Sequence, residues 1–310
     1  MQRALALAER GRGTAHPNPL VGAVIVRDGE VVGEGWHERA GEPHAEVHAL
    51  DAAGERARGA TMYVTLEPCA HHGRTPPCAD ALIAAGVARV VVGTWDVNPA
   101  AAGGVTRLRA AGLDVDVVEK REVRLQNAGY FSLYDRGRPW VILKLATTLD
   151  GRAAVPDERW ITGEESRRRV HELRAWVDAV AVGMGTVRAD SPRLDARGVA
   201  AKRQPRRLAF GRGPLPDEST LELRPGPLDE ELAALAQDGV QTLLLEGGPT
   251  LARSFLVAKL VDELHVYVAR RLGGSGPSWL DALAEKLTIR ELAIAGIGDD
   301  LLLTARLREP

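Results

Sequence analysis

Four residues in the N-terminal third of the chain have side chains suited to bind and use a metal ion. His44 and Glu46 stand two apart at the start of a helical pattern, and the two cysteines of the chain, Cys69 and Cys78, follow later. One imidazole and two thiolates leave the fourth position of a tetrahedral zinc ion open for water, as in catalytic zinc sites. Zinc lowers the pKa of bound water, and Glu46 is placed to transfer the proton without being a ligand. The residue types therefore predict a hydrolytic zinc site.

Each of these residues alone has an ordinary structural explanation. A single histidine is more often a surface or core residue, and a single cysteine is a small buried hydrophobe. Together, His-x-Glu and the later Pro-Cys dipeptide follow the signature of zinc deaminases that act on amino-substituted bases. That signature usually has Cys-x-x-Cys, whereas eight residues separate Cys69 from Cys78 here. The long spacing sets this chain apart from the deaminases with the short one.

The pattern of apolar residues predicts the elements that position these side chains. Asp28-Gly29, between two short apolar runs, is a strong hairpin signal. His44 opens a predicted helix, Cys69 follows a predicted strand, and Cys78 precedes the next helix. The expected strands of this block are 21–26, 30–33, 61–65, 89–92 and 113–119, and the expected helices are 44–54, 79–85 and 121–131. Such alternation predicts an α/β sheet covered by helices.

A charged turn near the middle of the chain is the best candidate for a domain linker. Residues 136–139 read Arg-Gly-Arg-Pro, between a helical pattern and a new strand. Because 310 residues exceed the usual size of one domain, we expect two, at 1–137 and 138–310. The second block repeats the α/β pattern, with strands expected at 140–146, 179–182, 207–210, 242–245 and 263–268 and a loop at 211–227.

Composition argues against nucleic-acid and membrane partners. Lys and Arg number 40 against 42 Asp and Glu, so the net charge of -2 gives no general attraction for phosphate backbones. Residues 1–9 are too short and too charged for a secretion signal, and no run approaches the roughly 20 apolar residues of a membrane span. We therefore expect a cytoplasmic protein whose two cysteines serve metal binding or catalysis rather than a disulfide.

Three segments around the predicted metal site resemble one particular family. The stretches 16–19 (His-Pro-Asn-Pro), 41–49 (Gly-Glu-Pro-His-Ala-Glu-Val-His-Ala) and 66–78, with its long loop between the cysteines, closely resemble the bifunctional deaminase/reductases of riboflavin biosynthesis. The resemblance implies a cytidine-deaminase-like three-layer α/β/α domain and a diaminopyrimidinone substrate that carries a ribosyl 5-phosphate. It also implies that Asn18, His37, His71 and Arg74 line the substrate pocket. Arg74 and His71 suit a phosphate or a polar ring edge, and Asn18 can read a base edge with its amide.

The resemblance continues through the second block, at 144–152, 160–163, 183–194, 245–251 and 260–263. It implies a dihydrofolate-reductase-like α/β domain that uses NADPH. The residues expected to contact NADPH are Ala146, Trp160, Thr186, Asp190 and the turn from Gly248 to Ser254, with Pro249 and Thr250. Those expected to hold the ribosyl phosphate are Arg174, Leu194, Arg197 and Glu246. Lys144 and Asp150 are candidate polar groups near the reacting end, although either could equally form a structural salt bridge.

Several alternatives remain open at this level. One is a deaminase with a degenerate reductase-like domain that serves binding or dimerisation. Glu158 adds a negative charge near the expected phosphate, and the segment 212–241 is short, without a strand and a helix that full-length members of the family carry. Another is a nucleic-acid-editing deaminase, and another is a structural zinc module with a fourth protein ligand. Members of the family self-associate, which implies a homo-oligomer, and the apolar strand 264–268 is a candidate surface for a dimer.

Overall fold

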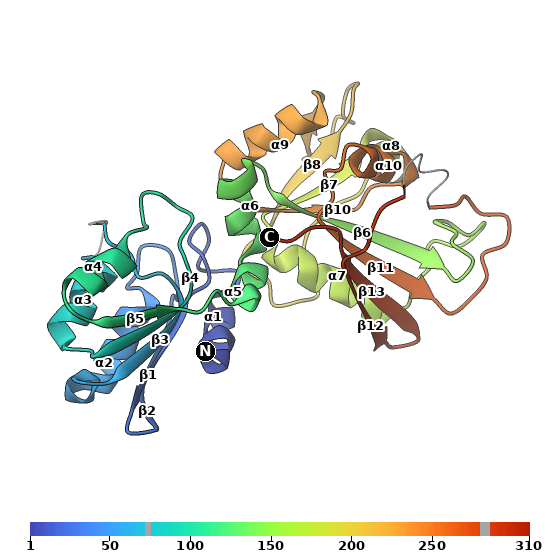
Figure 1. Cartoon of the computed structure of the whole chain (residues 1–310). Coiled ribbons are helices and arrows are strands. Elements are labelled where there is room, and N and C mark those ends of the chain that lie inside the picture. Colours follow the sequence, from blue (N-terminus) through green and yellow to red (C-terminus); the bar gives the residue numbers. More distant parts are fainter. Residues whose placement is uncertain (72–75, 280–285) are drawn as a thin grey trace. The chain divides into compact units, whose positions relative to one another are not determined.

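The chain folds into two compact units, shown by the computed structural model in Figure 1, which describes residues 1–71, 76–279 and 286–310. Residues Met1–Arg136, joined by Pro310, make up the first unit, and Gly137–Glu309 make up the second. Nowhere in the described ranges does a helix have both the length and the apolar character needed to cross a membrane.

The described residues of the first unit form a five-stranded sheet in the order β2-β1-β3-β4-β5. The strands are β1 (Gly22–Arg27), β2 (Glu30–Trp36), β3 (Thr61–Leu66), β4 (Arg89–Thr94) and β5 (Asp114–Val117). Strand β1 runs antiparallel to β2 and β3, whereas β3, β4 and β5 are parallel. Asp28 and Gly29 have positive φ angles of 52° and 81°, as a tight hairpin turn requires, and the predicted hairpin is confirmed.

Helices cover both faces of this sheet. They are α1 (Gln2–Ala8), α2 (Ala45–Ala53), α3 (Cys78–Ala85), α4 (Gly104–Ala110), α5 (Arg121–Gln126) and α6 (Ala128–Arg136), with short 3-10 turns at Glu9–Gly11 and Gly54–Ala57. Ile25 of β1 packs in one core with Ala49, Leu82 and Leu108 of α2 to α4, whereas the neighbouring Val24 packs with α1 on the opposite face. The alternation along one strand therefore produces three layers, α/β/α.

Glycines on β2 set how closely α2 approaches the sheet. A Cβ atom at Gly33 would lie 2.2 Å from the carbonyl oxygen of Ala49, and one at Gly35 would lie 2.3 Å from that of Ala45. Only glycine permits this contact between strand and helix backbones. The first turn of α2, which carries the predicted metal-site residues, is thereby held directly on the sheet.

The helix predicted at 121–131 is divided into α5 and α6 at Asn127. The buried Asn127 side chain accepts a hydrogen bond from Leu20 N (2.7 Å) and donates to Leu20 O (3.0 Å). These bonds join the junction of α5 and α6 to the segment before β1. A contact of this kind between distant residues leaves no trace in helical periodicity, which explains why the division was not predicted.

Within the ranges that the structure describes, the second unit has an eight-stranded sheet in the order β12-β13-β11-β6-β10-β7-β8-β9. The strands are β6 (Trp140–Thr148), β7 (Ala179–Gly183), β8 (Arg206–Phe210), β9 (Glu222–Arg224), β10 (Thr242–Leu245), β11 (Glu263–Ala269), β12 (Glu291–Ile297) and β13 (Asp300–Arg306). Neighbouring strands are parallel from β11 through β6, β10, β7 and β8 to β9. Strands β12 and β13 form an antiparallel hairpin at the other edge, and β13 runs antiparallel to β11.

Among the described residues, the helices that connect these strands are α7 (Glu164–Trp176), α8 (Met184–Asp190), α9 (Leu228–Gln237) and α10 (Pro249–Val257). Helices α9 and α10 pack on one face through Leu232 and Phe255, and α7 packs on the other through Val170. Crossovers between parallel strands are right-handed. The connection from β6 to β7 through α7 and the connection from β7 to β8 through α8 move across the sheet in the same direction. Helix α8 therefore lies on the same face of the sheet as α7. The connections after the neighbouring strands β7 and β10 therefore leave to opposite faces. In open α/β sheets, ligands usually bind at the carboxyl ends of such a strand pair.

The segment 212–241 is more regular than the sequence suggested. It contains β9 and α9, so the expectation of a simple loop at 211–227 is wrong. The expectation that relatives carry a further strand and helix in this segment stays a prediction. Strand β9 extends the sheet beyond β8, and Glu222 on β9 pairs with Arg206 on β8 at 2.6 Å. A strand of three residues is too short to produce a recognisable alternating pattern.

Candidate functional site

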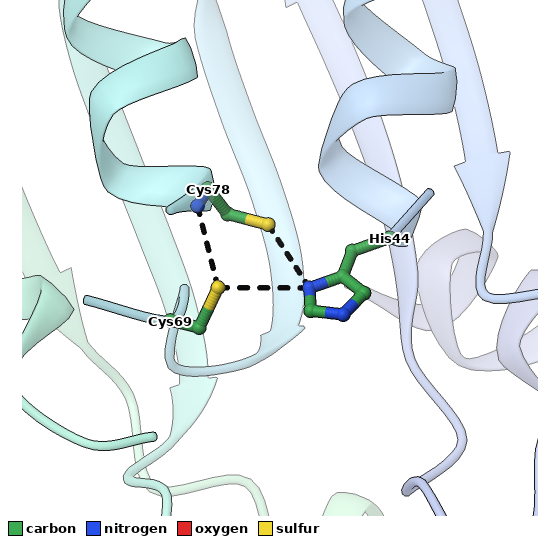
Figure 2. A group of neighbouring side chains, drawn as sticks. All are labelled: His44, Cys69 and Cys78. Atoms are coloured by element: carbon green, nitrogen blue, oxygen red, sulfur yellow. Dashed lines mark hydrogen bonds between the residues drawn. The ribbon is translucent and has the colours of Figure 1, made fainter. Parts of the chain in front are cut away.

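Three predicted metal ligands converge in the first unit. Figure 2 shows His44, Cys69 and Cys78 turned toward one another, and their ligand atoms all lie within 4.8 Å. His44 Nδ1 is 3.2 Å from Cys78 Sγ and 3.6 Å from Cys69 Sγ. With usual bond lengths, a tetrahedral zinc ion separates a nitrogen and a sulfur ligand by about 3.5 Å. The three side chains therefore fit zinc, and no fourth protein ligand joins them among the described residues, which argues against a structural zinc module.

Each ligand is placed by the end of a regular element. His44 is the N-cap residue of α2, Cys78 is the first residue of α3, and Cys69 follows the carboxyl end of β3. The backbone N–H of Cys78 donates to Cys69 Sγ at 3.3 Å. Helix N-termini stabilise negative charge, so the beginning of α3 favours the thiolate form that metal binding requires.

The two thiols have very different proton affinities. A hydrogen bond from the Cys78 thiol, together with bonds to His44 and the Cys78 backbone, lowers the pKa of Cys69 to about 4 in spite of its burial. Donation to Cys69 and burial raise the pKa of Cys78. Cys69 is therefore the first thiolate available to a cation, and metal binding must displace the proton of Cys78.

Glu46 lies beside the ligands without being one. It stands in the first turn of α2, its side chain is 3% exposed, and it contacts the Cys78 side chain. Burial raises its pKa to about 7. A carboxyl group that gains and loses a proton near neutrality next to an open metal position is suited to general acid/base catalysis.

The predicted pyrimidine-binding residues are partly brought together. His37 Nδ1 lies 3.3 Å from Pro43 O, which can only accept, so Nδ1 carries the proton. The other ring nitrogen, Nε2, then accepts from Asn18 Nδ2 at 3.0 Å. The His37 ring meets the His44 ring edge-on, with centroids 5.2 Å apart. Asn18 and His37 thus border the metal site, and the amide oxygen of Asn18 is left to accept a hydrogen bond from a ligand.

His71 and Arg74 belong to the loop between the two cysteines. His71 is exposed, two residues after Cys69. Arg74 lies outside the described residues. Their predicted contacts with the substrate remain a prediction.

Glu67 supports the segment that carries Cys69, and sequence reasoning missed it. Its buried carboxylate accepts hydrogen bonds from the backbone N–H groups of Gly103 (3.0 Å), Val105 (3.0 Å) and Asp96 (3.2 Å). These bonds fix the loop after β4 against the segment that leads into Cys69. The signal was a carboxylate directly before Pro68-Cys69, at the end of an apolar strand where a charge must find buried partners.

A buried group of charges in the second unit unites three of the predicted reductase residues. Arg174 donates to Glu246 with Nε (2.6 Å) and Nη2 (2.9 Å), and Lys144 Nζ lies 3.8 Å from the same carboxylate. Burial would raise the pKa of Glu246, but Arg174 and Lys144 outweigh it and hold this pKa below its usual range. Burial lowers the pKa of Lys144.

The group extends toward the segment after α8. Arg174 Nη1 donates to the carbonyl oxygen of Asp195 at 3.1 Å, and Arg197 Nη1 lies 2.5 Å from Asp195 Oδ1. Leu194, which is buried, precedes Asp195 with a positive φ of 54°. The structure thus brings Arg174, Leu194, Arg197 and Glu246 together. Their contact with a phosphate-bearing substrate stays a prediction.

Two glycine-rich turns follow the neighbouring strands β7 and β10. A Cβ atom added at Gly248 would have Thr186 Oγ1 3.8 Å away as its nearest neighbour, and one at Gly185 would meet no atom within 4 Å. The backbone is therefore open to close approach by a ligand. Gly248, Pro249 and Thr250 open α10, whose N-terminus favours phosphate, so these residues fit the cofactor expected there.

The remaining reductase residues lie in different surroundings. Ala146 stands on β6, Asp190 is exposed at the end of α8, and the half-exposed Trp160 ring has the Arg159 and Arg167 guanidinium groups 5.2 Å from its centroid.

Two acidic residues of this unit have partners of their own. Asp150 accepts hydrogen bonds from Thr148 and from the N–H groups of Gly273 and Gly274, which organise a turn. The charge of Glu158 is paired with Arg271 and does not stand alone.

Comparison with known proteins agrees with both units. Residues 1–94 match the family "cytidine and deoxycytidylate deaminase zinc-binding region", and residues 139–303 match the "RibD C-terminal domain". The chain is 43% identical to the riboflavin biosynthesis protein RibD of Escherichia coli, over 98% of this chain and 97% of that protein. It superposes on RibD of Acinetobacter baumannii with a TM-score of 0.91 at 38% identity, covering 99% and 97% of the two chains.

The deaminase/reductase of Thermotoga maritima, described as a diaminohydroxyphosphoribosylaminopyrimidine deaminase and 5-amino-6-(5-phosphoribosylamino)uracil reductase, gives a TM-score of 0.88 at 33% identity, again over 99% and 97%. Fold and site together define a bifunctional enzyme that joins a zinc-dependent deaminase to an NADPH-dependent reductase. The chain belongs to the RibD family of riboflavin biosynthesis.

Proposed function

We propose that residues 1–137 deaminate 2,5-diamino-6-(5-phosphoribosylamino)pyrimidin-4-one and that residues 138–310 reduce the ribosyl group of the product, 5-amino-6-(5-phosphoribosylamino)uracil, to ribityl. The observation that carries the first assignment is the set of His44, Cys69 and Cys78 with the buried Glu46 beside it. The second assignment rests on the Lys144, Glu246 and Arg174 group together with the glycine-rich turns after β7 and β10, where Gly185 and Gly248 leave the backbone open to a ligand.

In the deaminase half, His44, Cys69 and Cys78 would hold zinc. When bound, the ion supplies Lewis acidity that makes water a nucleophile near neutral pH. The Glu46 carboxylate takes one proton from the attacking water and delivers it to the ring nitrogen. It then carries the remaining hydroxyl proton to the departing amino group. Carbon 2 of the ring exchanges its C–N bond for a C–O bond, water is consumed and ammonia leaves. Burial keeps this proton away from solvent during the transfer.

Other residues of this half would position the substrate. The Asn18 amide nitrogen donates a hydrogen bond to His37, so the amide oxygen of Asn18 would accept a hydrogen bond from an N–H group on the pyrimidine edge. His37 keeps a neutral ring, because burial lowers its pKa, and it fixes the Asn18 amide in this orientation. His71 and Arg74 would bind the phosphate or the polar ring edge from the loop between the cysteines.

In the reductase half, Arg174, Leu194, Arg197 and Glu246 would hold the ribosyl phosphate. When bound, NADPH supplies a hydride for C1 of the ribosyl group. Ala146, Trp160, Thr186, Asp190 and the turn at 248–250 would hold this cofactor. Lys144, next to Glu246, would orient the polar groups of the sugar at the reacting end. We assign no such role to Asp150, because its carboxylate organises the turn at 273–274.

Removal of the metal separates the two activities. With the diaminopyrimidinone substrate and NADPH, the zinc-loaded chain should release ammonia and oxidise NADPH. A strong chelator should abolish ammonia release, and added zinc should restore it. NADPH oxidation with the already deaminated substrate should persist in the chelator, because the second unit holds its substrate without metal. Ammonia release that survives complete metal loss would refute the proposed mechanism, and ammonia release without any NADPH oxidation would favour the deaminase-only alternative.

We infer a homodimer in the cytoplasm, where the two free thiols stay reduced. The predicted strand 264–268 corresponds to β11, which lies inside the sheet between β6 and β13. The exposed apolar edge is instead β12, where Leu292 and Ile294 are 53% and 61% exposed. An exposed apolar edge strand is a ready surface for a second copy.

This assignment predicts the effect of a charge on β12. Ile294→Arg should convert a dimer into a monomer in light scattering at micromolar concentration, because a charge would be buried in the interface. Leu272→Arg, at a position 73% exposed and away from β12 in the sequence, is the control. A wild-type monomer, or a variant that remains dimeric, would show that β12 is not the interface.

A further inference from the structure

The hairpin of β12 and β13 holds the beginning of α7 through one carboxylate. Asp300 Oδ2 accepts hydrogen bonds from the backbone N–H of Gly163 at 2.7 Å and from Ser166 Oγ at 2.6 Å. Asp300 and Ser166 are both buried. Gly163 is the N-cap residue of α7 and has no side chain that could cap the helix. A carboxylate from a distant hairpin therefore satisfies the first turn of α7, as a local capping box does in other helices.

The hairpin itself is fixed to the sheet and to α7. Asp300 begins β13, which runs antiparallel to β11, so Asp300 lies at the carboxyl edge of the parallel strands. Ile297 of β12 packs with Val170 of α7 in one hydrophobic cluster. A Cβ atom at Gly298, in the turn of the hairpin, would lie 2.8 Å from Glu165 Oε2 of α7. The two bonds of Asp300 thus tie the start of α7 to the edge where ligands of open α/β sheets usually bind.

The segment before α7 is held from its other end as well. Arg271, which follows β11, donates with Nη2 to the carbonyl oxygen of Trp160 at 2.7 Å and pairs with the Glu158 carboxylate. Arg167, near the start of α7, donates to the carbonyl oxygen of Thr162 at 2.6 Å. The Arg167 guanidinium also lies 5.2 Å from the centroid of the Trp160 ring. The place of the half-exposed Trp160 ring therefore depends on the end of β11 on one side and on the start of α7 on the other.

Trp160 belongs to a long connection without helix or strand, between the end of β6 at Thr148 and the start of α7 at Glu164. Ordering a free segment costs conformational entropy, and a segment that is ordered beforehand does not impose this cost on ligand binding. We propose that Asp300 is a positioning residue of the reductase, which holds Trp160 in the place where it contacts NADPH. This role rests on the proposed function, in which Trp160 contacts the cofactor, and Asp300 acts only through Trp160.

The first test measures NADPH binding to the zinc-loaded full chain by calorimetry. Asp300→Ala should raise the Kd for NADPH about tenfold, because the start of α7 loses both bonds and binding must then order the Trp160 segment. Asp300→Asn keeps an oxygen that can accept both bonds, so its Kd should stay within about threefold of wild type. Asp299→Asn is the matched control, at an exposed carboxylate of the same turn whose partner is Arg270, and it should leave the Kd unchanged.

Kinetics and a double-mutant cycle separate positioning from a general loss of stability. In Asp300→Ala, the KM for NADPH should rise about as much as the Kd, whereas kcat at saturating NADPH should stay within about twofold, because the bound cofactor then orders the segment. Trp160→Ala should also raise the Kd. Adding Asp300→Ala to Trp160→Ala should change the Kd by less than about twofold, because the ring through which Asp300 acts is gone. Ammonia release should be equal in all these proteins.

A smaller change serves if Asp300→Ala does not fold. Ser166→Ala removes one of the two bonds to Asp300, and it should raise the Kd for NADPH about threefold in the wild-type chain but not in Trp160→Ala. An unchanged Kd in Asp300→Ala or Ser166→Ala, or effects that multiply fully with that of Trp160→Ala, would overturn the positioning role and leave the reductase function standing. A wild-type chain that binds no NADPH would instead refute the proposed reductase function itself.

Discussion

Replacing Glu46 by glutamine should abolish most of the deaminase activity and leave the metal in place. The amide keeps the size and part of the hydrogen bonding of the carboxylate, but it cannot take a proton from water. Loss of a positioned general acid/base costs about 10²–10⁴-fold in rate, and we expect the upper end because Glu46 is 3% exposed and solvent cannot replace it. Ammonia release under saturating substrate measures the effect.

Two comparisons distinguish this role from a structural one. Glu42→Gln changes an exposed carboxylate four residues earlier, whose partner is Arg39, and should leave ammonia release unchanged. Zinc content, and the rate of NADPH oxidation with the deaminated substrate, should be equal in wild type, Glu46→Gln and Glu42→Gln. Ammonia release by Glu46→Gln within tenfold of wild type would remove Glu46 from the mechanism, whereas loss of zinc would show that it supports the ligands.

The metal site could be predicted from sequence because each of its residues stands next to a local signal. His44 begins a helix, Cys78 begins another and Cys69 follows a strand, so the ends of three recognisable elements already indicated a common place. Parallel strands bring such ends to one edge of the sheet, and this geometry needs no further information. The motifs then supplied the chemistry.

The parts that escaped prediction depend on contacts between distant residues. Glu67 accepts hydrogen bonds from the backbone of Gly103 and Val105, 36 and 38 residues away in the sequence. Its place before Pro68-Cys69 indicates that it needs buried partners, but nothing near it in the sequence identifies which groups these are. The edge hairpin of β12 and β13 was not predicted either. Strand β12 is exposed on both faces, so it lacks the alternation of polar and apolar residues that identifies a half-buried strand.

Replacing Glu246 by glutamine should disable the reductase and spare the deaminase. The change leaves Arg174 and Lys144 buried without their shared anion, which costs about 3–5 kcal/mol when one partner of a buried pair is removed. We expect kcat/KM for NADPH oxidation to fall about a hundredfold or more, because the loss of about 3 kcal/mol of positioning at the sugar corresponds to this factor. Ammonia release should be unchanged. Absorbance of NADPH with the deaminated substrate measures the loss of reductase activity. The thermal transition of the second unit measures the loss of stability.

The pH dependence of that stability loss identifies its cause. Burial already lowers the pKa of Lys144, and without the Glu246 charge this pKa must fall further. The unfolded variant then binds a proton at Lys144 that the folded variant does not. The free energy of unfolding of the variant therefore rises with pH more than that of wild type, and the difference between the two becomes smaller. Glu172→Gln, an exposed partner of Arg168 and Arg169 on α7, should show neither the deficit nor its pH dependence. A deficit that stays constant from neutral pH to the usual pKa of lysine would mean that lost packing, not the unpaired cations, destabilises the variant.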